Sequence, residues 1–368
     1  MNRKIKSLLF VSVWPLLVFA QKTSVPMDEA HWDLKDAKYR FETFKGYPAL
    51  ALENGEAVMK SGSLKNGTID FDVAFESGRK FVGIHFRRQD DGNTEDFYLR
   101  PHQSGNPDAT QYTPVFNGLA GWQLYFGDGY SVPVAYAFGE WMHVRLVINN
   151  NRMEVFLVDM EKPLLHAFDL KRMVAAGGIS FWTNRGGAWF ANFSFEPSDN
   201  PALKSAPVKI PAPDPLTVPA WRVSQAFAEK EIDGKVSLDK RWKGQLQWGQ
   251  MGVEYSGVAN LARMAQIGEN TTTIVAAVTV ISDKAQVKRL DFGFSDYVRV
   301  FCNDQILYEG NDAFTSRDYR FLGSIGYFDA VYLPLKKGRN EIWMAVTENF
   351  GGWGIQARFQ DLEGLKLE

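Results

Sequence analysis

The stretch Gly67-Thr-Ile-Asp-Phe-Asp-Val-Ala-Phe75 decides the fold class, because its side chains alternate between apolar and polar. The apolar side chains share one parity: Ile69, Phe71, Val73 and Phe75. The other parity holds Thr68, Asp70, Asp72 and Ala74. Successive side chains of a β-strand point to opposite faces, so this pattern predicts a strand with one buried face.

The same alternation recurs on both sides of this stretch. In the first half it occupies residues 81–87, 97–100, 141–148 and 153–158, with a hairpin-type turn at 149–151. In the second half, residues 272–281 predict a strand that is buried on both faces, and further strands are predicted at 296–303, 331–335, 341–346 and 354–359. The one short helical piece that we predict lies near 260–263. Many short strands separated by Gly, Asn and Asp predict antiparallel sandwiches.

A proline-rich stretch divides the chain. Seven of the sixteen prolines fall between Pro197 and Pro219. Proline lacks an N–H and fixes φ, so this stretch predicts a semi-rigid linker. We therefore predict an all-β protein with two antiparallel β-sandwich (jelly-roll) domains joined by a Pro-rich linker. The predicted parts are a signal peptide (1–20), the first domain (21–197), the linker (198–217) and the second domain (218–368).

The first residues predict export. Three cationic side chains, Arg3, Lys4 and Lys6, precede an apolar run over residues 8–20 that ends in Val18-Phe-Ala20. That run is shorter than the about 20 residues that span a bilayer, which favours a cleaved signal peptide over a membrane anchor. We expect a periplasmic or extracellular protein whose mature chain carries no membrane anchor.

Charge and composition narrow the class of partner. A formal net charge of −2 argues against nucleic acid. Cys302 is the only cysteine, so no intramolecular disulfide can form, and its apolar neighbours predict a buried, inert thiol. Aromatic residues make up 14% of the chain, and flat aromatic faces suit sugar rings.

The first half resembles the concanavalin A-like lectin/glucanase superfamily, which includes laminin-G-like jelly rolls. The motifs that carry the resemblance are Phe71-Asp-Val73, Phe81-Val-Gly-Ile-His-Phe-Arg87, Phe97-Tyr-Leu-Arg-Pro-His-Gln-Ser-Gly-Asn-Pro-Asp108, Gln111-Tyr-Thr-Pro114, Trp122-Gln-Leu-Tyr125, Glu140-Trp-Met-His-Val-Arg145 and Ala191-Asn-Phe193. The resemblance implies a sandwich over most of residues 30–197. It is less specific for activity, because the superfamily holds lectins, hydrolases and adhesion modules.

The second half is similar to the galactose-binding-domain-like sandwiches that are appended to secreted carbohydrate enzymes. The motifs are Asp296-Tyr-Val-Arg-Val300, Asn303, Leu335-Lys-Lys-Gly-Arg-Asn340 and Asn349-Phe-Gly-Gly-Trp-Gly-Ile355. Within the last motif, glycines surround Trp353, which is our candidate sugar platform in this domain. The alternative, which we favour, is that Trp353 packs in the core.

Polar side chains of the first domain form the candidate binding site. In the resembled superfamily the outward face of one sheet receives glycan. Our candidate ligand-binding residues are His85, Arg87, Tyr98, Arg100, His102, Gln103, Asp108, Gln111, Tyr112, Gln123 and Tyr125. Such side chains supply planar donors, acceptors and stacking rings for a sugar. The alternative is an ordinary outer face with cross-strand ion pairs and a structural loop at 100–108.

A catalytic site is a weaker match. Glycosidases of the resembled superfamily space carboxylates along one strand, and Asp70 and Asp72 approach that spacing. Ala74 stands where a third acid is expected, so the pattern fails. If the protein is an enzyme, Asp70, Asp72 and His102 are the candidate catalytic residues. No zinc-type histidine spacing occurs, and no cofactor is expected beyond the structural calcium common in both resembled families.

The sequence thus predicts a secreted, non-catalytic lectin that recognises a polysaccharide or oligosaccharide through a polar groove in its first sandwich. Two weak sites on one chain would gain avidity through the linker. One alternative is a glycoside hydrolase or lyase with an atypical catalytic set. A second alternative is a structural or adhesion module that binds protein.

Overall fold

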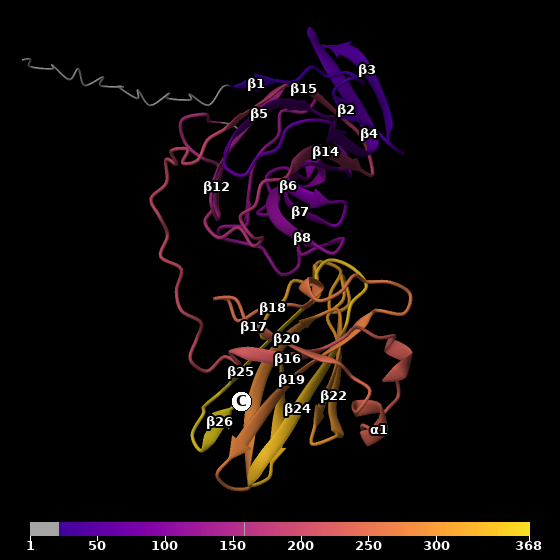
Figure 1. Ribbon diagram of the computed structural model, residues 1–368, viewed down its shortest axis with the longest axis vertical. Coiled ribbons are helices and arrows are strands. Elements are labelled where there is room, and N and C mark those ends of the chain that lie inside the picture. Colours follow the sequence, from indigo (N-terminus) through magenta and orange to yellow (C-terminus); the bar gives the residue numbers. More distant parts are fainter. Residues whose placement is uncertain (1–21, 158) are drawn as a thin grey trace, which may run out of the picture.

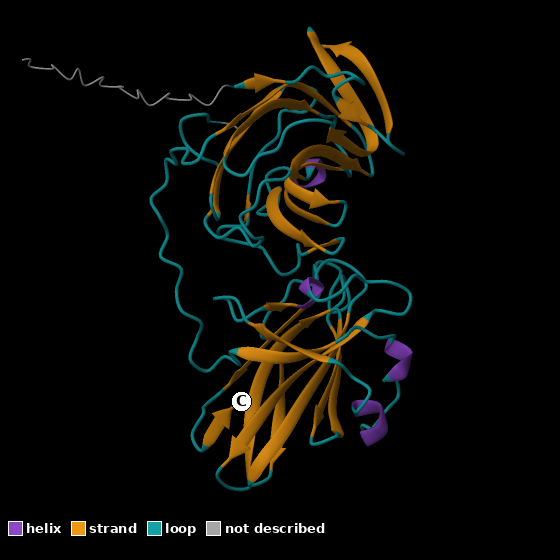
Figure 2. Ribbon diagram, viewed as in Figure 1, coloured by secondary structure: helices purple, strands orange, loops and turns teal. Residues whose placement is uncertain are grey.

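The computed structural model describes residues 22–157 and 159–368. The predicted signal peptide, residues 1–20, lies outside these residues. Within them, nearly all regular structure is β-strand, arranged as two sandwiches (Figures 1 and 2). The prediction of an all-β protein built from antiparallel sandwiches is confirmed. None of the helices in the described ranges is long and apolar enough to cross a bilayer.

The first sandwich pairs two sheets that share the long strand β4 (Tyr47–Met59). The β6 sheet contains β10 (Ser131–Val132), β8 (Thr110–Phe116), β7 (Asn93–Leu99), β6 (Phe81–Asp90), β14 (Gly178–Asn184), the second half of β4, β2 (Trp32–Asp33) and β9 (Leu119–Ala120). The β5 sheet contains β3 (Lys38–Phe44), the first half of β4, β15 (Ala188–Pro197), β5 (Gly67–Ala74), β11 (Met142–Asn149), β12 (Arg152–Phe156), β13 (Leu165–Ala167) and β1 (Thr23–Ser24). A single 3₁₀ turn, η1 (Pro101–Gln103), follows β7.

The alternating stretch at residues 67–75 forms β5 (Gly67–Ala74), and its apolar face is the buried one, as predicted. Ile69, Phe71 and Val73 are buried in the core between the two sheets. β5 pairs with β11 on one side and β15 on the other. Burying such a face is the main favourable term in folding, at about 25 cal/mol per Å² of apolar area.

The second sandwich also consists of two antiparallel sheets. The larger contains β17 (Trp248–Gly252), β16 (Ala220–Ser224), β19 (Thr273–Ser282), β24 (Gly338–Thr347), β21 (Tyr297–Cys302), β22 (Gln305–Asn311) and β26 (Leu365–Leu367). The smaller contains β18 (Ala259–Asn260), β25 (Gly354–Phe359), β20 (Gln286–Ser295) and β23 (Asp329–Leu335). The short helices are η2 (Glu229–Glu231), α1 (Lys240–Lys243) and η3 (Leu261–Arg263).

Helices were predicted only in part. The helical piece predicted near 260–263 is the 3₁₀ turn η3, whereas α1 was not predicted. Asp239 begins α1 by accepting hydrogen bonds from the N–H groups of Arg241 and Trp242. The tight turn between β21 and β22 has Asn303 and Asp304 at positive φ, a conformation that Asn and Asp tolerate.

The segment predicted as a linker, residues 198–217, contains no helix or strand and follows the outside of the molecule (Figure 1). Near its start, the N–H groups of Lys204 and Ser205 donate hydrogen bonds to Glu154 of β12. Its role as a semi-rigid joint and the domain boundaries stay predictions.

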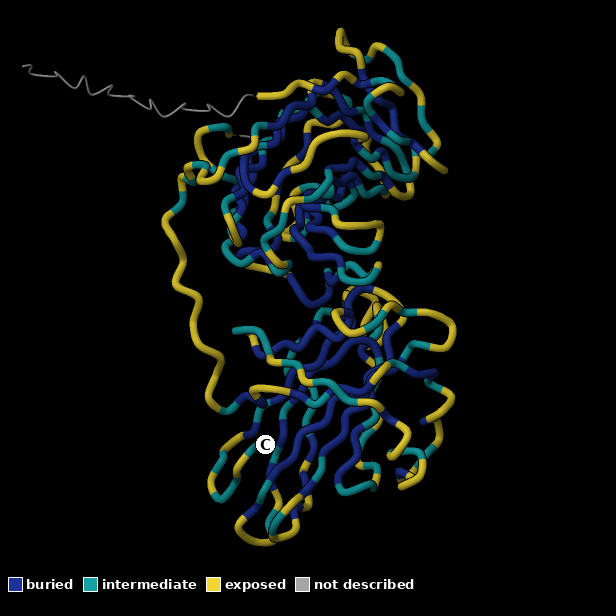
Figure 3. Tube along the Cα trace, in the orientation of Figure 1, coloured by how far each residue is buried: buried dark blue, intermediate teal, exposed yellow. Residues whose placement is uncertain are grey.

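Figure 3 shows where the two sandwiches meet, and side chains of each sandwich there join or contact the core of the other. Val258 and Ile325 of the second sandwich belong to the first core. Phe116 and Leu119 of the first sandwich pack against the second core. Cys302 is buried in the second core, as predicted.

Candidate functional site

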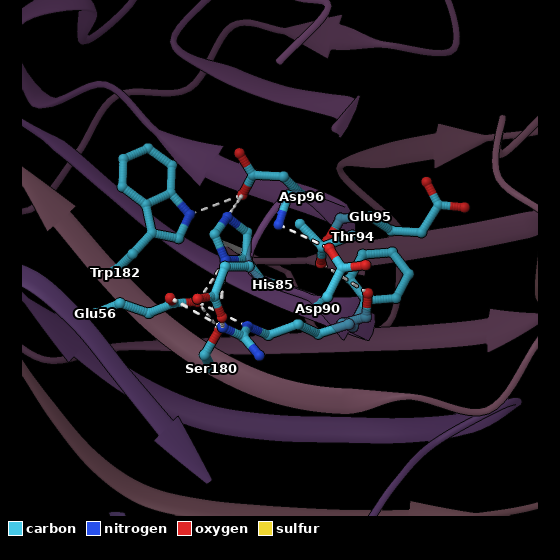
Figure 4. Close-up of polar contacts among 12 residues, drawn as sticks. Glu56, His85, Asp90, Thr94, Glu95, Asp96, Ser180 and Trp182 are labelled. Carbon is cyan, nitrogen blue, oxygen red and sulfur yellow. Dashed lines mark hydrogen bonds and ion pairs between the residues drawn. The ribbon is translucent and has the colours of Figure 1, made fainter. Parts of the chain in front are cut away.

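The candidate site lies on the face of the β6 sheet that points away from the core. Alternation along the strands separates the two faces, since Ile84, Phe97 and Phe181 are core residues. The opposite face carries the polar cluster that we call the His85 face: Glu56, His85, Asp96, Ser180 and Trp182 (Figure 4).

Strand register places these side chains next to one another. Ser180 of β14 lies opposite His85 of β6, and His85 lies opposite Asp96 of β7. Trp182 lies between Gly83 of β6 and Glu56 of β4. Residues that are opposite in an antiparallel pair have Cβ atoms about 4.5–5.5 Å apart, which brings four strands into one cluster.

Glu56 accepts hydrogen bonds from several donors. His85 Nδ1 lies 2.9 Å from Glu56 Oε1, Ser180 Oγ lies 2.5 Å from the same oxygen and Arg88 Nε lies 3.2 Å away. Burial alone would raise the pKa of Glu56, but the hydrogen bonds from His85 and Ser180 and the charge of Arg88 lower that pKa to about 2. Glu56 is therefore a carboxylate, so the proton in its hydrogen bond with His85 resides on Nδ1.

Asp96 has the opposite electrostatic character. Its side chain is buried, accepts a hydrogen bond of 2.8 Å from Trp182 Nε1 and lies 3.8 Å from His85 Nε2. Burial raises the pKa of Asp96 to about 6, although His85 and the indole N–H favour its charged form. Two carboxyl groups on either side of one imidazole thus have pKa values on opposite sides of the usual range.

Trp182 is half-buried and is held in place by three contacts. Its ring stacks on His85, with centroids 5.8 Å apart, and lies 5.8 Å from the Tyr98 ring. It also crosses the backbone of Gly83, where a Cβ would lie 2.3 Å from the indole Nε1. A ring held this way presents a fixed apolar surface beside a carboxylate and an imidazole.

Four of the predicted ligand-binding residues form a buried network beside the His85 face. Arg100 donates to Tyr98 Oη (2.6 Å), Gln111 Oε1 (2.6 Å) and Asp108 Oδ2 (2.5 Å). Tyr98 and Arg100 are only 4% and 6% exposed. The rings of Trp182, Phe81 and Trp122 lie against this network. Tyr98 and Arg100 therefore support the surface rings, and of the four side chains only Asp108, which is 23% exposed, reaches the solvent.

Arg87 is placed differently from the prediction. Its side chain is 1% exposed and donates to Lys65 O (2.6 Å), Asn66 Oδ1 (3.0 Å) and Asn150 O (2.6 Å). The pairing of β6 with β7 shifts after Phe86, and Arg87 has φ of 50°. This bulge breaks the alternation, so Arg87 leaves the face that its parity assigned to it.

Three other predicted residues also lie away from the His85 face. Tyr112 is a core residue whose hydroxyl donates to Glu95 Oε2 at 2.7 Å. Gln123 and Tyr125 are buried at the junction between the sandwiches, where Tyr125 donates to Glu254 Oε1 at 2.6 Å. Gln123 and Tyr125 thus contribute to the contact between the two sandwiches.

His102 and Gln103 both lie in the 3₁₀ turn η1 that follows β7. His102 Nδ1 is 3.1 Å from Lys80 O, and its ring contacts Phe81. Burial lowers the pKa of His102. Gln103 accepts a hydrogen bond from Asn106 within the same loop. Both side chains make local contacts that shape the loop.

The candidate catalytic residues are not brought together. Asp70 and Asp72 lie on the outer face of the β5 sheet, where His143 Nε2 and Nδ1 contact them at 3.1 and 2.7 Å. These two hydrogen bonds raise the pKa of His143 to about 9. Arg145 also pairs with Asp70 at 2.7 Å, so the two acids belong to an ion-pair network. His102 lies in the other sheet's loop.

Trp353 lies in the core of the second sandwich. It is 0% exposed and its indole N–H donates a hydrogen bond of 3.0 Å to Val346 O, so it packs as the favoured alternative predicted.

Within residues 22–157 and 159–368, no group of three His, Cys, Asp or Glu side chains is arranged to hold a metal ion. The expectation of a structural calcium stays a prediction.

Sequence reasoning found His85 but missed the residues around it. Asp96 has the same parity as Tyr98, and Ser180 and Trp182 alternate with Ile179 and Phe181. The alternation rule was therefore able to find them. Glu56 was harder, because β4 bends from one sheet to the other and its parity alone does not say which face is outside.

Comparisons with known proteins give structural likenesses only. Neither a protein-family model nor a curated relative matches this sequence. A carbohydrate-binding module from Bacillus subtilis aligns at 14% identity and a TM-score of 0.36, covering 45% of this chain and 95% of that chain. A protein with a galectin-like fold from Bacillus subtilis aligns at 10% identity and 0.34, covering 48% and 98%.

A β-glucanase from Bacillus licheniformis aligns at 9% identity and a TM-score of 0.34, covering 48% of this chain and 98% of that chain. At these identities and TM-scores, the comparisons assign the chain to no family.

Proposed function

We propose that this protein binds a carbohydrate on the His85 face of its first sandwich, without catalysis. The observation that carries the proposal is the half-buried indole of Trp182, fixed by Asp96 and Gly83 next to the charged carboxylate of Glu56. A flat ring takes the C–H surface of a sugar, while a carboxylate and an imidazole accept and donate hydrogen bonds to its hydroxyls. The partner is a polysaccharide or oligosaccharide.

The test is affinity electrophoresis against laminarin, xyloglucan, arabinoxylan, galactomannan and levan. We expect at least one polysaccharide to retard the wild-type protein and Trp182→Ala to abolish the retardation. Trp189→Ala is the matched control, because Trp189 is also half-buried and donates to a carboxylate, Glu42, at 2.7 Å on the outer face of the other sheet. If Trp182→Ala is still retarded, the polysaccharide does not bind at the His85 face.

A second candidate function is glycoside hydrolysis at the same face. It is favoured by one observation, the split between the pKa values of Asp96 and Glu56. A carboxyl with a raised pKa can protonate the leaving glycosidic oxygen, while a carboxylate accepts a proton from the attacking water. The His85 imidazole lies between the two carboxyl groups, with Nδ1 2.9 Å from Glu56 and Nε2 3.8 Å from Asp96.

The hydrolase candidate is tested by reducing-sugar release from the same five polysaccharides. If it holds, Asp96→Asn loses turnover but keeps retardation on the gel, whereas Glu56→Gln loses turnover and also weakens retardation, because its carboxylate contacts the sugar. Binding by the wild type without turnover on any substrate would reject hydrolysis and leave the binding proposal standing.

We also propose that the protein is exported, on the strength of residues 1–20 of the sequence. N-terminal sequencing of protein recovered from outside the cytoplasm should begin at Gln21. A start at Met1 would contradict cleavage.

A further inference from the structure

We propose that the second sandwich extends the His85 face, so that one neutral polysaccharide chain contacts both domains as a single site. This inference rests on the proposed function. The added surface is an aromatic rim made of Trp122, from the first sandwich, and Phe314 and Phe350, from the second. The sequence had instead suggested two separate weak sites joined by a linker.

The first step is continuity between the His85 face and the rim. The Tyr98 ring lies 5.8 Å from the Trp182 ring. The Arg100 guanidinium carbon lies 5.1 Å from the Tyr98 ring centroid and 5.7 Å from that of Trp122. The buried side chains of Tyr98 and Arg100 thus contact both half-buried indoles, so that one network holds Trp182 and Trp122.

The second step is the crossing from one sandwich to the other. Trp122 meets Phe350 with centroids 5.6 Å apart and Phe314 at 6.4 Å, both edge to face. Phe314 and Phe350 lie 6.5 Å from each other. They are 41% and 58% exposed, although a large apolar ring is normally buried. Three rings from two sandwiches therefore form one partly exposed aromatic surface.

The third step is that the crossing is fixed in place. Gln123, the neighbour of Trp122, is 0% exposed and makes four hydrogen bonds into the second sandwich. Its N–H donates to Gly351 O (2.9 Å) and its carbonyl accepts from Ile325 N (3.0 Å). Its side chain donates to Leu322 O (2.9 Å) and accepts from Ser295 Oγ (3.0 Å). The rim consequently keeps a constant position relative to the His85 face.

The loop that carries Phe314 is also held. Arg317 forms ion pairs with Asp312, which is 0% exposed, and with Asp329 of β23. Arg320 pairs with Asp318 at 3.0 Å. The arginines of this loop are thus matched by carboxylates, which favours a neutral chain over a polyanion as the occupant. Exposed rings among paired charges are suited to sugar rings, which offer both C–H surfaces and hydroxyls.

The experiment uses the full chain and whichever of the five polysaccharides retards it, together with short and long fragments obtained from that polysaccharide by partial acid hydrolysis. Affinities are measured by isothermal titration calorimetry. The variants are Phe350→Ala, Phe314→Ala with Phe350→Ala, and Trp182→Ala. The matched control is Tyr332→Ala, another exposed ring of the second sandwich, 65% exposed on β23.

We expect long fragments to bind wild-type protein more tightly than short ones. The rim variants should weaken long-fragment binding about tenfold, or about 1.4 kcal/mol, and leave short-fragment binding unchanged. Trp182→Ala should weaken both lengths, and Tyr332→Ala neither. Because Phe350 is exposed, its single variant should keep the wild-type melting temperature, which separates lost contact from lost fold.

Two results would overturn the inference. If rim variants bind long fragments as the wild type does, the second sandwich is not part of the site, whereas the proposed function stands through Trp182→Ala. If wild-type protein is retarded by none of the five polysaccharides, the proposed function fails and the extended site fails with it.

Discussion

The indole of Trp182 occupies the space that a side chain at Gly83 would need. A Cβ on Gly83 would lie 2.3 Å from Trp182 Nε1 and 2.4 Å from Cε2. Real Cβ atoms do not approach other atoms this closely. The position of Trp182 on β14 therefore requires a glycine at position 83 of the neighbouring strand β6. Gly83 therefore fixes the half-buried ring of Trp182 in the candidate site.

Gly83→Ala should displace Trp182 and weaken polysaccharide binding about tenfold, because the indole loses its place and its hydrogen bond to Asp96. Gly252→Ala is the matched control, since a Cβ there meets no atom within 4 Å. Retardation on the polysaccharide gel measures the effect. Equal retardation of the two variants would show that Trp182 tolerates the methyl group.

Asp96 should make stability depend on pH. Its pKa is raised from 3.8 to about 6 by burial, so the folded protein binds a proton that the unfolded chain releases. The stabilising contribution is complete below about pH 3.8 and is lost as pH rises through about 6, amounting to up to about 3 kcal/mol. Asp96→Asn should therefore be more stable than the wild type above pH 6 and equally stable near pH 4.

Glu56→Gln is the counterpart with the opposite sign. The pKa of Glu56 is lowered to about 2, so its contribution is present above about pH 4.5 and is lost as pH falls through about 2. This variant should be less stable than the wild type at pH 6. Urea unfolding of both variants at pH 4, 6 and 8 checks both signs. Parallel pH profiles for the two variants would contradict the assignment.

Arg87→Met should cost about 2–4 kcal/mol of unfolding free energy, because it removes the three hydrogen bonds of a guanidinium group whose side chain is 1% exposed. The folded fraction should bind polysaccharide like the wild type, since Arg87 lies away from the His85 face. Arg145→Met is the control, because its side chain is 38% exposed beside Asp70 and surface pairs contribute about 0–1 kcal/mol. If fully folded Arg87→Met did not bind polysaccharide, Arg87 would have to be part of the binding site.

Gly351→Ala should loosen the contact between the sandwiches. At φ of 108°, a Cβ would lie 2.3 Å from Gln123 Oε1 and 2.9 Å from Trp122 Cε2. Gly338→Ala is a matched control, because it has φ of 90° but meets nothing within 4 Å. Calorimetry should show one unfolding transition for the wild type and the control. The Gly351 variant should give two transitions, and a single transition would mean that the junction absorbs the change.

Much of the fold followed from local pattern. The alternation in residues 67–75 predicted the strand β5 and its buried face, and the hairpin turn predicted at 149–151 connects β11 and β12. The bulge at Arg87 did not follow, because a bulge is set by the pairing of two strands and leaves no mark in parity. The same limit hid the burial of Tyr98 and Arg100, which depends on rings from three other segments.

The sequence alone determined an all-β chain with two β-rich halves separated by prolines, because period-2 alternation and proline act within a few residues. Tertiary structure decided which polar side chains meet. Glu56, His85, Asp96 and Trp182 come from four strands, and only their register brings them together. It also decided that Trp122 faces Phe314 and Phe350 across the domain junction, because residues this far apart in sequence become neighbours only when two packed cores come into contact.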